Sequence, residues 1–203
     1  MSRADKFYRM CTTLPADEDY DDRDETYVPE LVEVAKLRDS GALNDAIAYG
    51  KSIQKMYPDY DLIAYMVAHI YFQQQQPKEA MDVALAAIRD CKRKYRLYSV
   101  VGLAEYDIDN VANALVWWCR SVVAQGLVSD FQEYDPFLHL SYAAEMTRAN
   151  KEARILMTMV DAIEPQSPRL NDSYLEKMQS VRTSWARAPF VKAIEHIVEQ
   201  YFT

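Results

Sequence analysis

A short triplet recurs along this chain at a fixed spacing. Asp45-Ala46-Ile47, Glu79-Ala80-Met81 and Asn113-Ala114-Leu115 each place an alanine between a polar and an apolar residue, and these alanines lie 34 residues apart both times. Glu152-Ala153-Arg154 is a weaker fourth copy, 39 residues after the third. A period of this length is typical of stacked repeat proteins, in which each unit buries its apolar face only against the next unit.

The residues between these alanines have the apolar period of helices. One apolar helical face is formed at the spacing i, i+3, i+4 and i+7 by Ala64, Val67, Ala68 and Tyr71. We expect a helix from about Leu43 to Met56, ended by Pro58. Turns are expected at Gly41, before Pro77 and at Asp109-Asn110. The chain has only 4 glycines among 203 residues, which favours helices over β-rich folds and phosphate loops.

The regular spacing is interrupted once. Residues 125–133 contain Gly126, Ser129 and Asp130, which predict a loop that lengthens this junction by five residues. Beyond the fourth unit, one helix is expected after the capping residues Asn171-Asp172-Ser173 and another from Pro189. These two helices would cover the apolar face of the last unit.

The pattern resembles the tetratricopeptide repeat family. That family has a small residue at positions 8 and 20 of each unit, and here position 8 holds Val34, Ala68, Gly102 and Ser141. Gly50 at position 24 and Glu105 at position 11 depart from the family pattern. The resemblance implies an all-α fold, a right-handed superhelical array of about four helical hairpins with a C-terminal helical cap. The expected hairpins are 27–60, 61–94, 95–128 and 134–167, after an acidic flexible segment at 1–26 and before capping helices at 168–203.

The resemblance also implies which side chains line a concave groove, because positions 2, 5, 9 and 12 of each first helix face it in the family. On the first two hairpins these positions hold Val28, Leu31, Ala35, Arg38, Leu62, Tyr65, His69 and Phe72. On the last two they hold Arg96, Ser99, Leu103, Tyr106, Asp135, Leu138, Tyr142 and Glu145. Tyrosine side chains bury area at low entropic cost and keep a hydrogen-bonding tip. We expect a protein or peptide segment to bind there; internal packing of these residues is the alternative.

Charge is spread unevenly along the chain. The formal net charge is -8, and residues 16–30 contain eight acidic residues and one arginine. This balance argues against nucleic-acid binding, which needs lysine and arginine at phosphates. The basic cluster Lys92-Arg93-Lys94 with Arg96 complements a helix C-terminus, or else docks an acidic segment such as 17–25. No apolar run of about 18 residues and no secretory h-region is present, so we expect a cytoplasmic protein without membrane insertion.

Motifs for catalysis and metal binding are missing from the sequence. His69, His139 and His196 lie in different predicted elements without neighbouring ligands, and Cys11, Cys91 and Cys119 form no zinc or disulfide pattern. We therefore expect a non-catalytic adaptor, scaffold or chaperone-like module that needs no cofactor and no metal. Two alternatives stay open: a self-associating subunit that uses the amphipathic helix after Pro189, and an enzyme or a regulatory subunit of an enzyme.

Overall fold

The computed structural model describes residues 29–125, 133–146, 148, 150–165 and 176, and these ranges contain helices and turns but no strand. This confirms the predicted all-α class. The helices are α2 (Glu30–Asp39), α3 (Leu43–Met56), α4 (Asp61–Gln73), α5 (Pro77–Ala87), α6 (Tyr95–Asp107), α7 (Val111–Gln125), α8 (Asp135–Met146) and α9 (Asn150–Ile163). The bounds predicted for α3 agree with the structure, and α5 begins at Pro77 as expected.

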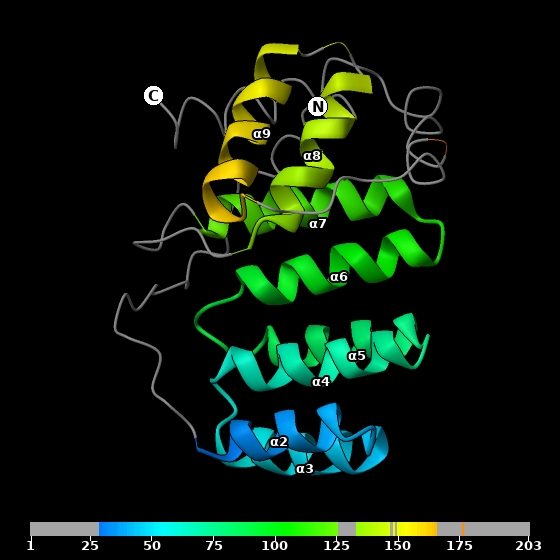
Figure 1. The fold of residues 1–203 in the computed structure, drawn as a ribbon, viewed down its shortest axis with the longest axis vertical. Coiled ribbons are helices and arrows are strands. Elements are labelled where there is room, and N and C mark those ends of the chain that lie inside the picture. The colour runs from blue at the N-terminus through cyan, green and yellow to red at the C-terminus, as the bar shows by residue number, and fades with distance from the viewer. Residues whose placement is uncertain (1–28, 126–132, 147, 149, 166–175, 177–203) are drawn as a thin grey trace.

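Consecutive helices pack against each other as hairpins. Each helix contacts the next one along the chain, and α6 also contacts both α4 and α8. Figure 1 shows the pairs α2–α3, α4–α5 and α6–α7 as successive layers lying across the long axis of the molecule. The first helices of the second and third hairpins, α4 and α6, therefore lie side by side in the middle of the molecule.

The four hairpins turn in the same way. The backbone is left-handed at Gly41 (φ 84°), Gln75 (φ 59°), Asp109 (φ 68°) and Arg148 (φ 63°), at spacings of 34, 34 and 39 residues. In the first three hairpins the amide of this residue donates to the carbonyl three residues back, and the next amide donates to the carbonyl five residues back. This is the Schellman helix end, which satisfies carbonyls that the helix leaves open. The repeat found in the alanines thus exists in the backbone as well.

The repeated small residues lie where helices approach closely. Ala46, Ala80 and Ala114 are fully buried, whereas the fourth copy, Ala153, is half-buried. At Gly102 an added Cβ would overlap the indole ring of Trp118 on α7. A side chain at this position would therefore push α6 away from α7.

Both departures from the family pattern have local explanations. A Cβ on Gly50 would lie 2.5 Å from Cγ2 of Val67, so this glycine leaves room for a large residue of the next hairpin. Glu105 is buried, and its carboxylate accepts hydrogen bonds from the side-chain amides of Asn110 (2.8 Å) and Asn113. The carboxylate therefore ties the turn between α6 and α7 together.

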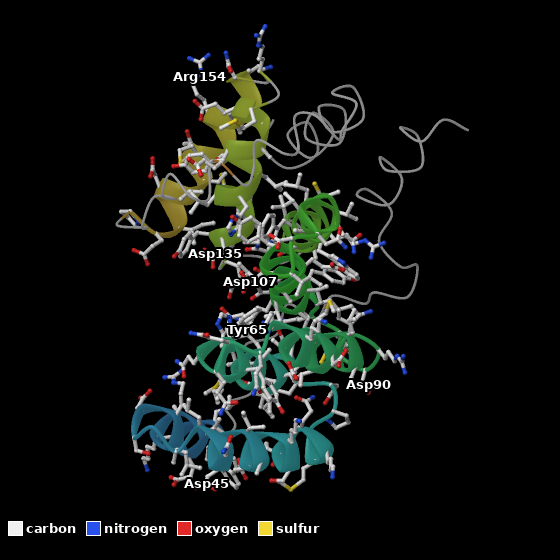
Figure 2. The ribbon with its side chains drawn as sticks, turned by 90° about the vertical axis from the view of Figure 1, so that its right-hand side faces the viewer. Asp45, Tyr65, Asp90, Asp107, Asp135 and Arg154 are labelled. Atoms are coloured by element: carbon white, nitrogen blue, oxygen red, sulfur yellow. The ribbon has the colours of Figure 1, made fainter. Side chains whose placement is uncertain are left out.

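The fourth hairpin has a different orientation from the others. In both views α8 and α9 stand along the long axis, whereas α6 and α7 lie across it (Figures 1 and 2). This change follows the junction that the sequence lengthens by five residues. The described part of that junction consists of Gln125, which ends α7, and of Glu133 and Tyr134, which precede α8.

Several predicted segments lie outside the described residues. They are the acidic segment 1–26, the loop residues 126–132 and the C-terminal region 168–203, apart from Glu176, which is helical. Val28 of the predicted groove and the amphipathic helix after Pro189 also lie outside the described residues.

Candidate functional site

Helix α4 presents a row of aromatic rings at the predicted groove positions. The ring centroids of Tyr65 and His69 lie 4.3 Å apart, and those of His69 and Phe72 lie 5.9 Å apart. All three side chains are half-buried, as is Leu62 on the same helix. Figure 2 shows Tyr65 midway along the molecule, between the hairpins that carry Asp45 and Arg154.

His69 is electrostatically unusual within this row. Its Nε2 atom is buried and has no hydrogen-bond partner. Burial, helped by the positive charge of Arg38, lowers the pKa of His69 to about 4. The ring is therefore neutral at physiological pH and packs as an aromatic group with one unused polar atom.

A polar cluster joins α4 and α6 to the residue that precedes α8. The Tyr65 hydroxyl donates to Oε2 of Glu133 at 3.1 Å, and Nε of Arg96 lies 3.6 Å from Oε1 of the same carboxylate. Nη1 of Arg96 donates to Oδ2 of Asp61 at 3.2 Å. Arg96 and Asp61 are both buried, so these charges interact with little screening by water.

The backbone of Glu133 is held separately by Gln125 at the end of α7. The Oε1 atom of Gln125 accepts from the Glu133 amide at 2.9 Å, and its Nε2 atom donates to the Glu133 carbonyl at 3.1 Å. Gln125 is fully buried. One amide side chain therefore satisfies both backbone groups of Glu133 and holds this part of the backbone against the end of α7.

Burial dominates the titration of this cluster. It raises the pKa of Glu133 to about 7, with Asp135 and Asp61 adding to the increase and with Arg96 and the Tyr65 hydrogen bond opposing it. Burial also raises the pKa of Asp135. The pKa of Tyr65 is raised by burial and then by the charge of Glu133, so this phenol stays a hydrogen-bond donor. The cluster can therefore exchange a proton near neutral pH through Glu133.

A second cluster connects α6, α7 and α8 through aromatic rings. His139 stacks on Trp118 with centroids 3.8 Å apart and an interplanar angle of 4°. Tyr106 contacts both rings, with centroids 6.0 Å from Trp118 and 6.2 Å from His139. Burial lowers the pKa of His139 to about 3, so this ring is neutral. The predicted groove residues Leu103, Leu138 and Tyr142 pack into the same core.

The remaining predicted groove residues are divided between core and surface. Ser99 is buried in α6, whereas Leu31 packs half-buried against the core of the first hairpin. Arg38 pairs with Asp39 at 2.9 Å, and Glu145 is exposed on α8. All four groove positions of α4 are therefore partly exposed in the centre of the molecule. Of those on α6, Arg96 and Ser99 are buried, as the internal-packing alternative expects, whereas Leu103 and Tyr106 are half-buried.

Sequence reasoning did not identify Glu133, Gln125 or His139 as site residues. Glu133 and Gln125 flank a segment interpreted as a loop, and His139 was one of three isolated histidines. The sequence did contain one sign that His139 is buried, because it follows Phe137 and Leu138 in the apolar first half of α8.

The described part of the chain contains no group of three or more His, Cys, Asp or Glu residues that could hold a metal ion. None of its helices is long and apolar enough to cross a membrane. Cys91 and Cys119 are buried free thiols. No family model, curated protein or solved structure matches this chain.

Proposed function

We propose that this chain is a non-catalytic protein–protein interaction module of the tetratricopeptide-like kind. It would bind an extended or helical protein segment in a concave groove, with α4 at its centre. The observation that carries this proposal is the α4 row, where Leu62, Tyr65, His69 and Phe72 stay half-buried although they lie in the middle of the molecule. Half-buried aromatic side chains with a polar tip are the groups that dominate protein interfaces.

The repeated turns support the same proposal. Because the left-handed residue recurs with the spacing of the alanines, the hairpins form one series of similar units. Repeat series of this kind present long surfaces made of the same helix position in successive units. The mixed apolar and polar character of the α4 row suits a peptide that contributes both side chains and backbone groups.

The α4 row can be tested with two matched double variants. Leu62→Ala/Phe72→Ala changes the row, whereas Met56→Ala/Leu85→Ala removes two exposed apolar side chains from α3 and α5. Tyr106 and Tyr142 are less suitable, because both pack against the core of α7 to α9. Each protein would be used to capture partners from native lysate, with circular dichroism as a check of helicity.

We expect partners of the wild type to be lost from the Leu62/Phe72 variant and kept by the Met56/Leu85 variant. The affinity of a captured partner would then be measured by calorimetry, with an expected loss of at least about tenfold for the first variant. Equal binding by both variants would refute the α4 row as the binding surface.

A further inference from the structure

Glu133 connects parts of the chain that are distant in sequence. Its carboxylate contacts Tyr65 on α4 and Arg96 on α6, while its backbone is held by Gln125 on α7. It also lies two residues before the first residue of α8. A single residue therefore ties the start of the fourth hairpin to the second and third hairpins.

The charges around Glu133 do not balance when all of them are ionised. The carboxylates of Asp61 and Asp135 act electrostatically on that of Glu133, and among the described residues the guanidinium of Arg96 is the cation paired with it. Among the described residues, the Tyr65 hydroxyl and the Gln125 amide, both neutral, also contact Glu133. Removing one negative charge by protonation would relieve this excess.

We propose that Glu133 is a pH-dependent tie, whose protonation state determines how firmly the hairpin α8–α9 is held against α4 and α6. The Glu133 contacts have the geometry that such a tie needs, because they span three hairpins at the one junction where the repeat spacing is broken. This proposal does not depend on partner binding.

The direction of the effect follows from the raised pKa. When the hairpin α8–α9 is packed against α4 and α6, the pKa of Glu133 is about 7, compared with 4.5 for an exposed glutamate. The stabilisation from this proton is therefore fully present below about pH 4.5 and is lost as the pH rises through about 7. Alkaline conditions should loosen the fourth hairpin.

Another titrating group on α8 acts in the opposite direction. His139 packs against Trp118 on α7, and its lowered pKa means that the packed fourth hairpin disfavours protonation of the His139 ring. Its contribution is present above about pH 6.5 and is lost as the pH falls. The pH dependence of hairpin opening in the wild type therefore combines the effects of Glu133 and His139. Comparison with a Glu133→Gln variant isolates the first, because His139 is common to the two proteins.

The test is amide hydrogen exchange on the full chain at pH 5 and pH 8, for wild type and Glu133→Gln. Glutamine keeps the size of the side chain and stays neutral at both values. At pH 5 we expect α8 and α9 to open about equally often in the two proteins. At pH 8 we expect them to open tens of times more often in the wild type than in Glu133→Gln. The ratio should stay near one in α2 and α3, which do not contact Glu133.

Tyr65→Phe provides an independent variant that keeps the carboxylate. Loss of the hydroxyl removes a hydrogen bond that favours the ionised form, so the titration midpoint of the Glu133 carboxyl carbon should move upward in NMR spectra. The proposal is refuted if the wild-type to Glu133→Gln opening ratio in α8 and α9 is the same at pH 5 and pH 8. It is also refuted if Glu133 titrates near 4.5 in the wild type.

Discussion

The junction between α3 and α4 and the junction between α7 and α8 solve the same packing problem with different chemistry. At the first, Gly50 leaves room for Val67, and Ile53 and Ile63 are fully buried beside them. At the second, Gln125, Glu133 and their polar partners add a buried polar cluster to the apolar core that α7 shares with α8 and α9. Apolar packing tolerates small adjustments of its neighbours, whereas a buried polar cluster is stable only when each member keeps its partner.

This difference coincides with the spacing of the repeat. The α3–α4 junction lies within a regular 34-residue period, whereas the α7–α8 junction lies within the 39-residue interval. The aromatic stack of Trp118 and His139 lies in the apolar core of the second junction. The change in orientation of α8 and α9 therefore occurs where the hairpin contact has become partly ionic (Figure 1).

The largest expected effect comes from removing the cation of the polar junction. Arg96→Met would leave the carboxylates of Asp61 and Glu133 without their shared guanidinium. We expect the free energy of unfolding in urea to fall by about 3–5 kcal/mol at pH 8, as for other broken buried ion pairs. The loss should be smaller at pH 5, where Glu133 is neutral. Ile63→Val at the apolar junction is the control, with a loss of about 1 kcal/mol that does not depend on pH.

The next largest loss of stability is expected from substitutions of Gly102 and Gly50, where helices pack closely. We expect Gly102→Ala to reduce the free energy of unfolding by about 3 kcal/mol, because the new methyl group meets the rigid indole of Trp118. Gly50→Ala should cost about 2 kcal/mol, because it meets a valine methyl group that can move. Thermal and urea unfolding would measure both. If Gly102→Ala costs no more stability than Gly50→Ala, the indole adjusts at least as easily as the valine.

The pH dependence of stability sharpens the comparison further. His139→Phe removes a neutral ring that the fold prevents from becoming protonated, so the variant should lose less stability than the wild type as the pH falls from 7 to 5. The expected difference is about 2 kcal/mol, from a pKa lowered from 6.5 to about 3. Glu133→Gln should change the profile by a similar amount with the opposite sign. Urea unfolding at several pH values would measure the free energy of unfolding of the wild type and both variants. Parallel pH profiles would contradict this assignment.

The smallest effects are expected at the repeated turns. Gly41→Ala should cost about 1 kcal/mol, because φ is 84° and alanine avoids this region even though the space around it is open. Asp109→Gly and Gln75→Gly should instead stabilise the protein by a few tenths to about 1 kcal/mol, since both residues already have positive φ. Thermal unfolding would measure the three variants. Destabilisation by both glycine substitutions would mean that the side chains of Gln75 and Asp109 contribute more than the turn geometry.

Much of the fold could be predicted from local signals in the sequence. The alanine spacing, Pro58, Pro77 and Gly41 determine where helices begin and end through short-range sterics, and the structure confirms these elements. The predicted burial of small residues holds at Ala46, Ala80 and Ala114. Such features depend on residues within one turn or one hairpin, which a sequence pattern can reveal.

The polar junction could not be predicted in the same way. Glu133, Arg96, Tyr65 and Gln125 come together only after three hairpins have packed, and each residue type is ordinary for a solvated helix or loop. The burial of Arg96 and Ser99, which occupy predicted groove positions, has the same origin. The family-like register places them on the first helix of a hairpin, but the neighbouring elements decide whether they face solvent.

A double-mutant cycle between Arg96→Met and Glu133→Gln tests the polar junction most directly. The free energies of unfolding of wild type, both single variants and the double variant would be measured in urea at pH 8 and at pH 5. We predict a coupling free energy of at least about 1 kcal/mol at pH 8, where Glu133 is ionised, and a value near zero at pH 5. A coupling of zero at both pH values would contradict the account, because ionised Glu133 and Arg96 would then not interact at the junction.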